Sequence, residues 1–261
     1  MNRRKTLGRL AALYAAFTVS QFAHAAPAAP ATPAGPVKNV VLVHGLFADG
    51  SSWGKVIPLL QAKGLHVTAV QNPTTSLPDD VAAVRRALAL QDGPTLLVAH
   101  SYGGMVISEA GADPKVSGLV YIAARAPDAG EDYPALTKKF PAAPASAGIK
   151  WEADGFGALT EAAFVKDFAG DLAPAEARVY YAVQQRMGKP ITQARTTVAA
   201  WREKPTWYAV STQDRTIDPD LERFMAKRMG AKTIELKASH VSLLSQPRAV
   251  ADLILQAAHV N

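Results

Sequence analysis

The amino-acid sequence predicts an α/β fold built on a doubly wound, mostly parallel sheet. Short apolar runs rich in β-branched residues alternate with helical patterns over most of the chain, and this alternation is typical of a sheet with helices on both faces. The connections between the segments are short, which favours crossovers between parallel strands. At residues 95–104 a buried strand runs through a serine directly into a helix. Because ligands of such sheets bind beyond the carboxyl ends of the strands, we expect a functional site at this edge.

Each predicted element is bounded by residues that start or stop regular structure. The first helix ends at Gly64, and Gly93 and Pro94 end the second. Asp218 and Pro219 form a typical helix start further along the chain. We expect strands at residues 37–43, 65–70, 95–99, 116–123, 206–211 and 233–236, and helices at residues 53–63, 79–91, 102–112, 219–229 and 247–259.

The turn at Ser101 has the composition that a sharp strand-to-helix connection needs. Such a turn strains the backbone of its central residue, so the residues two before and two after it must be small. These positions hold Ala99 and Gly103. The hydroxyl of Ser101 would then stand above the sheet edge. The N–H of Tyr102 would open the next helix, where free N–H groups stabilise a negatively charged oxygen.

The first 25 residues predict a secretory signal peptide. Basic residues at positions 3–5 precede an apolar run at residues 10–19, and small residues at positions 23 and 25 form a typical signal peptidase site. The apolar run is too short and too rich in alanine for a transmembrane anchor. We therefore expect cleavage after Ala25 and a secreted or periplasmic protein without a stable membrane anchor.

The chain that remains carries little net charge. Residues 1–25 contain four basic residues and no acidic residue, so their removal lowers the formal charge from +6 to +2. This small charge, without basic runs interleaved with aromatic residues, gives no sign of a nucleic-acid partner. A semi-extended Pro/Ala-rich tether at residues 26–36 precedes a single folded domain at residues 37–261.

The sequence indicates neither a disulfide framework nor a cofactor. The chain has no cysteine, so its stability depends on its apolar core in any redox environment. Its histidines lack the spacing of metal ligands, and its glycine-rich turn has no lysine of the kind that a phosphate-binding loop carries. We therefore expect no metal ion and no redox cofactor.

Two segments resemble motifs of the α/β-hydrolase superfamily. Residues 99–103, Ala-His-Ser-Tyr-Gly, resemble its nucleophile elbow, with alanine in place of the first glycine of the usual Gly-x-Ser-x-Gly. Residues 44–46, His-Gly-Leu, resemble the turn that follows the strand beside the nucleophile strand in that family. The resemblance covers residues 37–258 and is greatest to the small methylesterase and hydroxynitrile lyase branch.

This resemblance implies the α/β-hydrolase fold and an oxyanion hole. The N–H groups of Leu46 and Tyr102 would hold the developing oxyanion, with Phe47 as the alternative to Leu46. His44 in the same turn is expected to pack and to hydrogen-bond rather than to take part in the chemistry.

The resemblance also implies a catalytic triad. A serine hydroxyl needs a base to accept its proton and a third group to orient that base. The family's order of serine, acid and histidine along the chain gives Ser101, Asp214 and His240. Asp214 is favoured because it directly ends a predicted strand. Asp218 has an alternative role as a helix cap, and Asp128 follows the preceding strand, where some hydrolases carry their acid.

The strand and helix alternation stops at residues 125–204. In the superfamily an insertion at this point forms a lid, and its patterns predict a helical lid with helices at residues 159–168, 174–187 and 192–201. Its aromatic residues either line an apolar acyl or aryl pocket or pack within the lid. They are Trp151, Phe156, Phe164, Phe168, Tyr180, Tyr181 and Trp201.

These features predict a secreted serine hydrolase that cleaves small carboxylic esters through an acyl-enzyme on Ser101. One alternative is a hydroxynitrile-lyase-like or other carbon–carbon lyase. Lyases of this branch carry a hydroxyl residue at the position of Gly45, which argues against this alternative. A second alternative is a hydrolase-like protein that binds a small ligand without catalysis. The sequence does not identify the acyl part or the alcohol part of the substrate, or the oligomeric state of the protein.

Overall fold

A six-stranded parallel sheet forms the centre of the folded domain. In the computed structural model, which describes residues 36–259, the strand order is β2-β1-β3-β4-β8-β9. All five neighbouring pairs are parallel. Strands β1, β3 and β8 are buried along their whole length. This burial is typical of strands whose sequences are near-continuous apolar runs. The strands are β1 Asn39–Val43, β2 His66–Val70, β3 Thr95–His100, β4 Val116–Ile122, β8 Thr206–Ser211 and β9 Lys232–Leu236. The predicted fold class is therefore confirmed.

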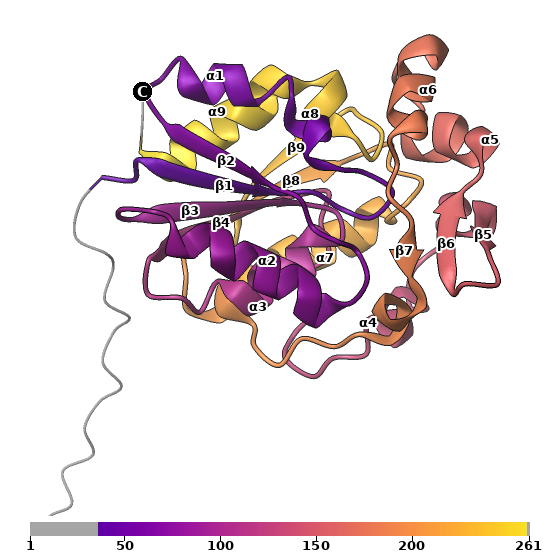
Figure 1. Cartoon of the computed structure of the whole chain (residues 1–261), viewed down its shortest axis with the longest axis horizontal. Helices are drawn as coiled ribbons and strands as arrows, with labels where there is room; N and C mark the ends of the chain where they lie inside the picture. Colours follow the sequence, from indigo (N-terminus) through magenta and orange to yellow (C-terminus); the bar gives the residue numbers. More distant parts are fainter. Residues whose placement is uncertain (1–35, 260–261) are drawn as a thin grey trace, which may run out of the picture. The chain divides into compact units, whose positions relative to one another are not determined.

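Helices cover both faces of this sheet (Figure 1). One face carries α1 (Ile57–Gln61) and α9 (Pro247–Ala258), which contact each other. The other carries α2 (Leu77–Ala89), α3 (Gly103–Ala110) and α7 (Pro219–Met229). Apolar faces of both layers pack on the strands and form one continuous core.

The first helix is shorter than predicted. The segment expected as one helix at residues 53–63 instead forms a 3₁₀ turn at Gly50–Trp53, followed by α1 from Ile57. Pro58 has no N–H and its ring clashes with the carbonyl four residues earlier, so an α-helix cannot run through it from Trp53. The short α8 (Ser242–Ser245) was not predicted.

The lid at residues 125–204 combines short helices with a small sheet, which the prediction of a helical lid did not include. A three-stranded antiparallel sheet has the order β5-β6-β7. The lid elements are α4 Tyr133–Thr137, β5 Ile149–Trp151, β6 Phe156–Leu159, α5 Glu161–Ala163, a π-helical turn at Phe164–Phe168, α6 Pro174–Ala182 and β7 Met187–Gly188.

Two of the three predicted lid helices form in part. Residues 192–201 contain only ends of 3₁₀ turns. Strand β7 pairs with β6 across about thirty residues of chain, with Phe156 opposite Gly188. Such non-local pairing depends on the tertiary fold rather than on local periodicity.

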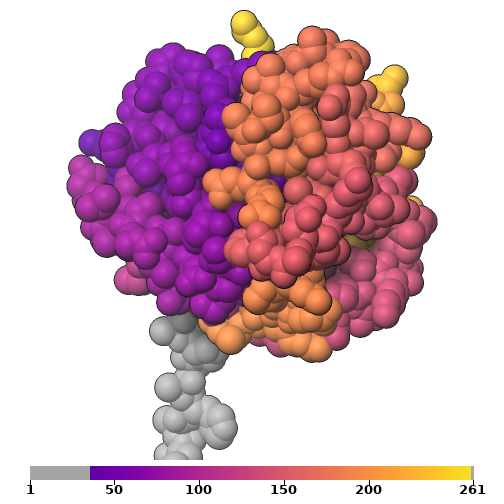
Figure 2. Space-filling model, turned by 45° about the vertical axis from the view of Figure 1, so that its right-hand side comes forward, coloured from indigo at the N-terminus to yellow at the C-terminus, as the bar shows by residue number. Residues whose placement is uncertain are grey.

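The lid lies against the N-terminal third of the domain. In Figure 2 the pink and orange lid segments border the indigo and purple ones. The N–H of Gly188 donates to the carbonyl of Thr74 at 2.7 Å, and the Thr74 hydroxyl donates to the carbonyl of Arg186 at 2.8 Å. These bonds anchor β7 to the loop before α2.

The predicted signal peptide and nearly all of the predicted tether lie outside the described residues. Within residues 36–259, no helix combines the length and the apolar composition that crossing a bilayer requires.

Removing the cap of α7 should weaken the fold. The Asp218 carboxylate accepts the Asp220 N–H at 2.9 Å and so satisfies a free donor at the helix start. We expect Asp218→Ala to lower the free energy of unfolding by about 1 kcal/mol. Asp218→Asn keeps a capping oxygen and should remain within a few tenths of a kcal/mol of the wild type. Urea unfolding compares the three proteins, and an equal loss in both variants would contradict a capping role.

Candidate active site

Ser101 occupies a strained turn between β3 and α3. Its φ of +55° lies in the left-handed region, which a serine rarely adopts. A Cβ on Gly103 would lie 2.8 Å from the carbonyl oxygens of both Val43 and His44, so only glycine fits there. Ala99 is fully buried. The requirement for small residues on both sides of the serine is therefore confirmed.

The structure brings Ser101, Asp214 and His240 into one hydrogen-bonded chain. His240 Nε2 lies 2.8 Å from Ser101 Oγ, and His240 Nδ1 lies 2.5 Å from Asp214 Oδ2. The three residues follow the carboxyl ends of β3, β8 and β9. With Asp214 ionised, Nδ1 carries the proton and donates to the carboxylate, while Nε2 is free to accept the proton of the serine.

The backbone orients Asp214 for this contact. Its Oδ1 accepts the N–H groups of Thr216 at 2.6 Å and Ile217 at 2.9 Å, which leaves Oδ2 for the histidine. The two alternative acids have other partners: Asp218 caps α7, and Asp128 pairs with Arg202. Of the three acids, only Asp214 contacts His240.

A second buried acid beside Asp214 escaped the sequence analysis. Glu222 on α7 is fully buried and accepts the N–H of Ser211 at 3.1 Å. Burial and the nearby charge of Asp214 raise the pKa of Glu222 well above its usual value. This shift favours the neutral form of Glu222 beside the Asp214 carboxylate. No local signal marks it, because an acid on a helix normally faces solvent.

The loop that carries His240 is held from two sides. His100 Nε2 lies 2.9 Å from the carbonyl oxygen of His240, and burial lowers the pKa of His100 well below its usual value. From the lid, the Phe168 ring packs against the His240 ring at 5.1 Å between centroids. Asp171 accepts the N–H of Ser239 at 2.9 Å. The lid thus contributes directly to the position of the imidazole.

His44 shapes the turn that precedes Leu46. The His44 ring accepts the N–H of Asn72 through Nε2 at 2.9 Å and contacts the Gly45 carbonyl through Nδ1 at 2.8 Å. Burial lowers the pKa of His44, so the ring is neutral and these bonds are its task. The expected structural role of His44 is confirmed.

The two expected oxyanion donors have free N–H groups. Among the described hydrogen bonds, none uses the N–H of Leu46 or of Tyr102. Both residues adjoin Ser101: Tyr102 follows it, and a Cβ on Gly45, next to Leu46, would lie 2.5 Å from the Ser101 Cβ. Free donors beside the hydroxyl are the feature that an oxyanion hole requires.

A buried acid fixes Tyr102. The Tyr102 hydroxyl donates to Asp80 Oδ2 at 2.8 Å, and Asp80 Oδ1 accepts the N–H of Thr74 at 2.8 Å. Desolvation raises the pKa of Asp80 to about 6. Because Thr74 also anchors the lid, Asp80 connects the lid, α2 and the residue that follows the serine.

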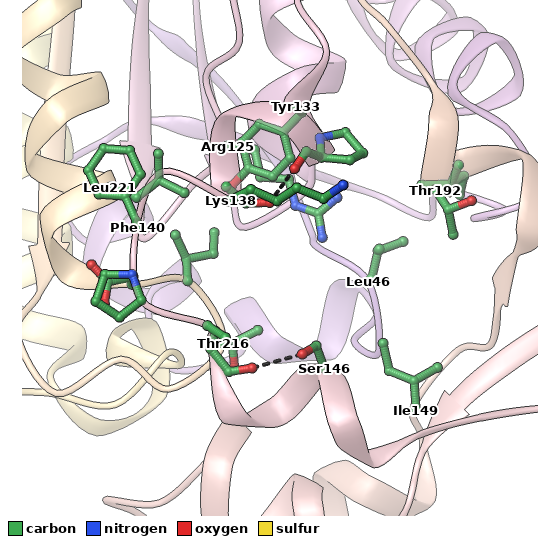
Figure 3. A pocket seen from close by; sticks show the side chains of 18 of the residues that line it. Leu46, Arg125, Tyr133, Lys138, Phe140, Ser146, Ile149, Thr192, Thr216 and Leu221 are labelled. Atoms are coloured by element: carbon green, nitrogen blue, oxygen red, sulfur yellow. Dashed lines mark hydrogen bonds between the residues drawn. The ribbon is translucent and has the colours of Figure 1, made fainter.

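A pocket of about 550 Å³ opens beside this site (Figure 3). Its lining includes Leu46, Arg125 and Thr216, so the pocket adjoins the residues of the site described above. None of the seven lid aromatics named above lines this pocket, which uses Tyr133 and Phe140 instead. Phe164 and Phe168 pack with Tyr181 and with the His240 loop. For these lid aromatics the packing alternative is correct.

Two further residues of the pocket, Arg125 and Tyr133, were not predicted from the sequence as site residues. The sequence did contain a signal for Arg125, because this residue follows the end of a strand at the edge of the sheet where ligands bind.

Within residues 36–259, no three His, Asp or Glu side chains gather in a way that suits a metal ion.

A parallel sheet with a serine, histidine and aspartate chain at its carboxyl edge is the arrangement typical of α/β hydrolases. The model of the alpha/beta hydrolase family matches residues 40–253. The chain therefore belongs to the alpha/beta hydrolase family.

Comparison with known proteins supports the methylesterase branch. The chain is 27% identical over 246 residues to methylesterase 8 of Arabidopsis thaliana, covering 84% of this chain and 88% of the relative. It is 26% identical to salicylic acid-binding protein 2 of Nicotiana tabacum, with 85% and 97% covered. The crystal structure of a pyrethroid hydrolase from Sphingobium faniae superposes with a TM-score of 0.71 at 24% identity, with 85% and 98% covered.

Replacing Asp80 by asparagine should change how stability depends on pH. The pKa of Asp80 is raised from 3.8 to about 6, so its contribution to stability is present below pH 4 and is lost as the pH rises through 6. The measured quantity is the difference in the free energy of unfolding, wild type minus Asp80→Asn. This difference should fall by at most about 3 kcal/mol as the pH rises from 4 to 7.

Urea unfolding followed by tryptophan fluorescence at several pH values measures this difference. Asp79→Asn is the matched control, because Asp79 is exposed and hydrogen bonds from Ser76 and Thr75 lower its pKa. The control should show no such fall over this range. A flat or rising difference for Asp80→Asn would contradict the assigned state of Asp80.

Proposed function

We propose that this protein hydrolyses small carboxylic esters through an acyl-enzyme on Ser101. The hydrogen-bonded chain from Asp214 through His240 to Ser101, at 2.5 and 2.8 Å, carries the proposal. It provides a base for a hydroxyl that is otherwise a poor nucleophile. The names of the methylesterase and pyrethroid hydrolase relatives support ester cleavage.

The geometry suggests the role of each residue. His240 Nε2 accepts the Ser101 proton as Oγ attacks the ester carbonyl, and Asp214 stabilises the imidazolium. The N–H groups of Leu46 and Tyr102 hold the oxyanion. His240 then returns the proton to the leaving alcohol. Water, activated by the same base, releases the acid and restores the serine.

Export is part of the same proposal. The basic residues at positions 3–5, the apolar run that follows and the small residues before position 26 support a cleaved signal peptide. The enzyme would then act outside the cytoplasm.

The proposal rests on Ser101 as nucleophile, so Ser101→Ala should abolish covalent labelling by a fluorophosphonate. The variant should also lower kcat/KM for 4-nitrophenyl acetate by at least about 10³-fold, because no other hydroxyl of residues 36–259 is hydrogen-bonded to the His240 ring. Ser146→Ala removes a hydroxyl from the neighbouring pocket and should label as the wild type does. If the wild type fails to label, or Ser101→Ala still labels, the proposed mechanism is wrong, and the ligand-binding alternative gains support.

The environment of Gly45 disfavours the lyase alternative. A Cβ at this position would lie 2.5 Å from the Ser101 Cβ and 3.2 Å from its Oγ. The hydroxyl residue that the lyases of this branch carry here therefore requires the serine to move.

We expect Gly45→Thr to lower kcat/KM for 4-nitrophenyl acetate at least about tenfold, because it displaces the nucleophile. Gly93→Ala is the matched control, since a Cβ there meets nothing within 4 Å. Circular dichroism and thermal melting check that both variants fold. Unchanged ester turnover in Gly45→Thr, or release of benzaldehyde from mandelonitrile by the wild type, would favour the lyase alternative.

A further inference from the structure

Arg125 places a cation in the pocket that Leu46 also lines. It follows strand β4, and its backbone N–H donates to the carbonyl of Ser101 at 2.9 Å. Its side chain lines the 550 Å³ pocket together with Leu46. Figure 3 shows the guanidinium turned toward the open middle of this pocket. A ligand bound there would therefore lie against Leu46, whose N–H is an expected oxyanion donor.

The guanidinium of Arg125 has no carboxylate partner among the described residues. The ion-paired arginines of this part of the chain are Arg178, Arg186, Arg195, Arg202, Arg215, Arg223 and Arg228. Three others, Arg85, Arg86 and Arg248, also lack an ion pair, but all three are exposed to water. Arg125 is only partly exposed, and its Nε is buried without any hydrogen-bond partner.

Two aromatic rings hold the guanidinium in this position. Its central carbon lies 5.1 Å from the centroid of the Tyr133 ring and 6.0 Å from that of the Tyr102 ring. Such contacts orient the group without neutralising it. The hydroxyl of Tyr133 is itself buried and has no hydrogen-bond partner. The wall of the pocket therefore contains two polar groups whose hydrogen-bonding capacity is unused.

The remaining charges of the pocket leave it positive. Lys138 lines it, is exposed and makes no ion pair with any described residue. Asp218 also lines it, but its carboxylate is bound to the N-terminus of α7. Most other lining residues are apolar, among them Ile149 and Leu221. An apolar pocket with one unpaired guanidinium suits a ligand with an apolar body and one negative charge.

We propose, on the basis of the ester hydrolysis proposed above, that Arg125 selects esters that carry a separate ionised carboxylate. The planar guanidinium matches a carboxylate with two parallel N–H donors. Hydrolysis adds the hydroxyl of water to the acyl carbon and its proton to the leaving alcohol. The charged group remains unchanged in whichever fragment bears it.

Two pairs of esters test this selectivity at pH 7. The first pair is 4-acetoxybenzoate and the neutral 4-acetoxybenzamide, which places the charge in the leaving group. The second pair is monomethyl suberate and methyl octanoate, which places it in the acyl part. For at least one pair, the wild type should show a kcat/KM about tenfold or more higher for the charged ester.

Arg125→Met should lower the ratio of charged to neutral kcat/KM by about 10- to 100-fold, chiefly through KM, and Arg125→Lys should restore part of it. Arg248→Met removes an exposed, unpaired arginine on α9 and should leave the ratio unchanged. An equal loss for both esters would assign Arg125 a structural role. No preference in the wild type would also overturn the inference.

A binding measurement separates this inference from the proposed function. Calorimetry with Ser101→Ala should detect binding of 4-acetoxybenzoate that is lost in Ser101→Ala/Arg125→Met. If the wild type neither labels with the fluorophosphonate nor turns over any ester, the proposed function is wrong, while charge-selective binding would still support the carboxylate site. If the wild type labels and hydrolyses neutral esters but shows no charge preference and no such binding, only the role of Arg125 is wrong.

Discussion

The left-handed backbone of Ser101 is the constraint on which the rest of the site depends. A non-glycine residue in this region costs roughly 1 kcal/mol or more, so neighbouring contacts must hold it. The N–H of Ser101 donates to the Ile122 carbonyl at 3.2 Å, and its carbonyl accepts the N–H groups of Gly104 at 3.0 Å and Arg125 at 2.9 Å. The turn directs Oγ toward His240 and leaves the following N–H free. The same turn explains why glycine is required at positions 45 and 103.

Charge around this turn is controlled by burial. Asp214 has two backbone donors on one oxygen and the imidazole on the other. Burial and the charge of Asp214 raise the pKa of Glu222 beside it, and desolvation raises the pKa of Asp80 near Tyr102 to about 6. Of these three acids, only Asp214 is hydrogen-bonded to the histidine. This arrangement keeps the imidazole in the tautomer that can accept the serine proton.

The lid does more than cover the site. Phe168 packs on the His240 ring, Asp171 binds the neighbouring backbone, and the lid supplies Tyr133 to the pocket. Its structure was predicted least well. Strands β5, β6 and β7 are two to four residues long. Strands this short carry no clear period, and β7 is stabilised by partners far away in the sequence. The helical patterns of the lid sequence therefore did not predict its small sheet.

The sequence by itself determined the parallel sheet and the small residues around Ser101, and the resemblance to a known family added Ser101 and His240 together with three candidate acids. These features can be inferred without coordinates, because they follow from strand periodicity, from the steric limits of a sharp turn and from the order of residues along the chain. Only the tertiary structure decided which acid contacts His240, that Glu222 lies buried beside it, and that Arg125 enters the pocket unpaired. These features depend on distances and dielectric environments in the folded chain, as does the contact of Ser101 with His240 across 139 positions. Folding alone creates such proximities, because no local pattern encodes what a side chain meets across the core.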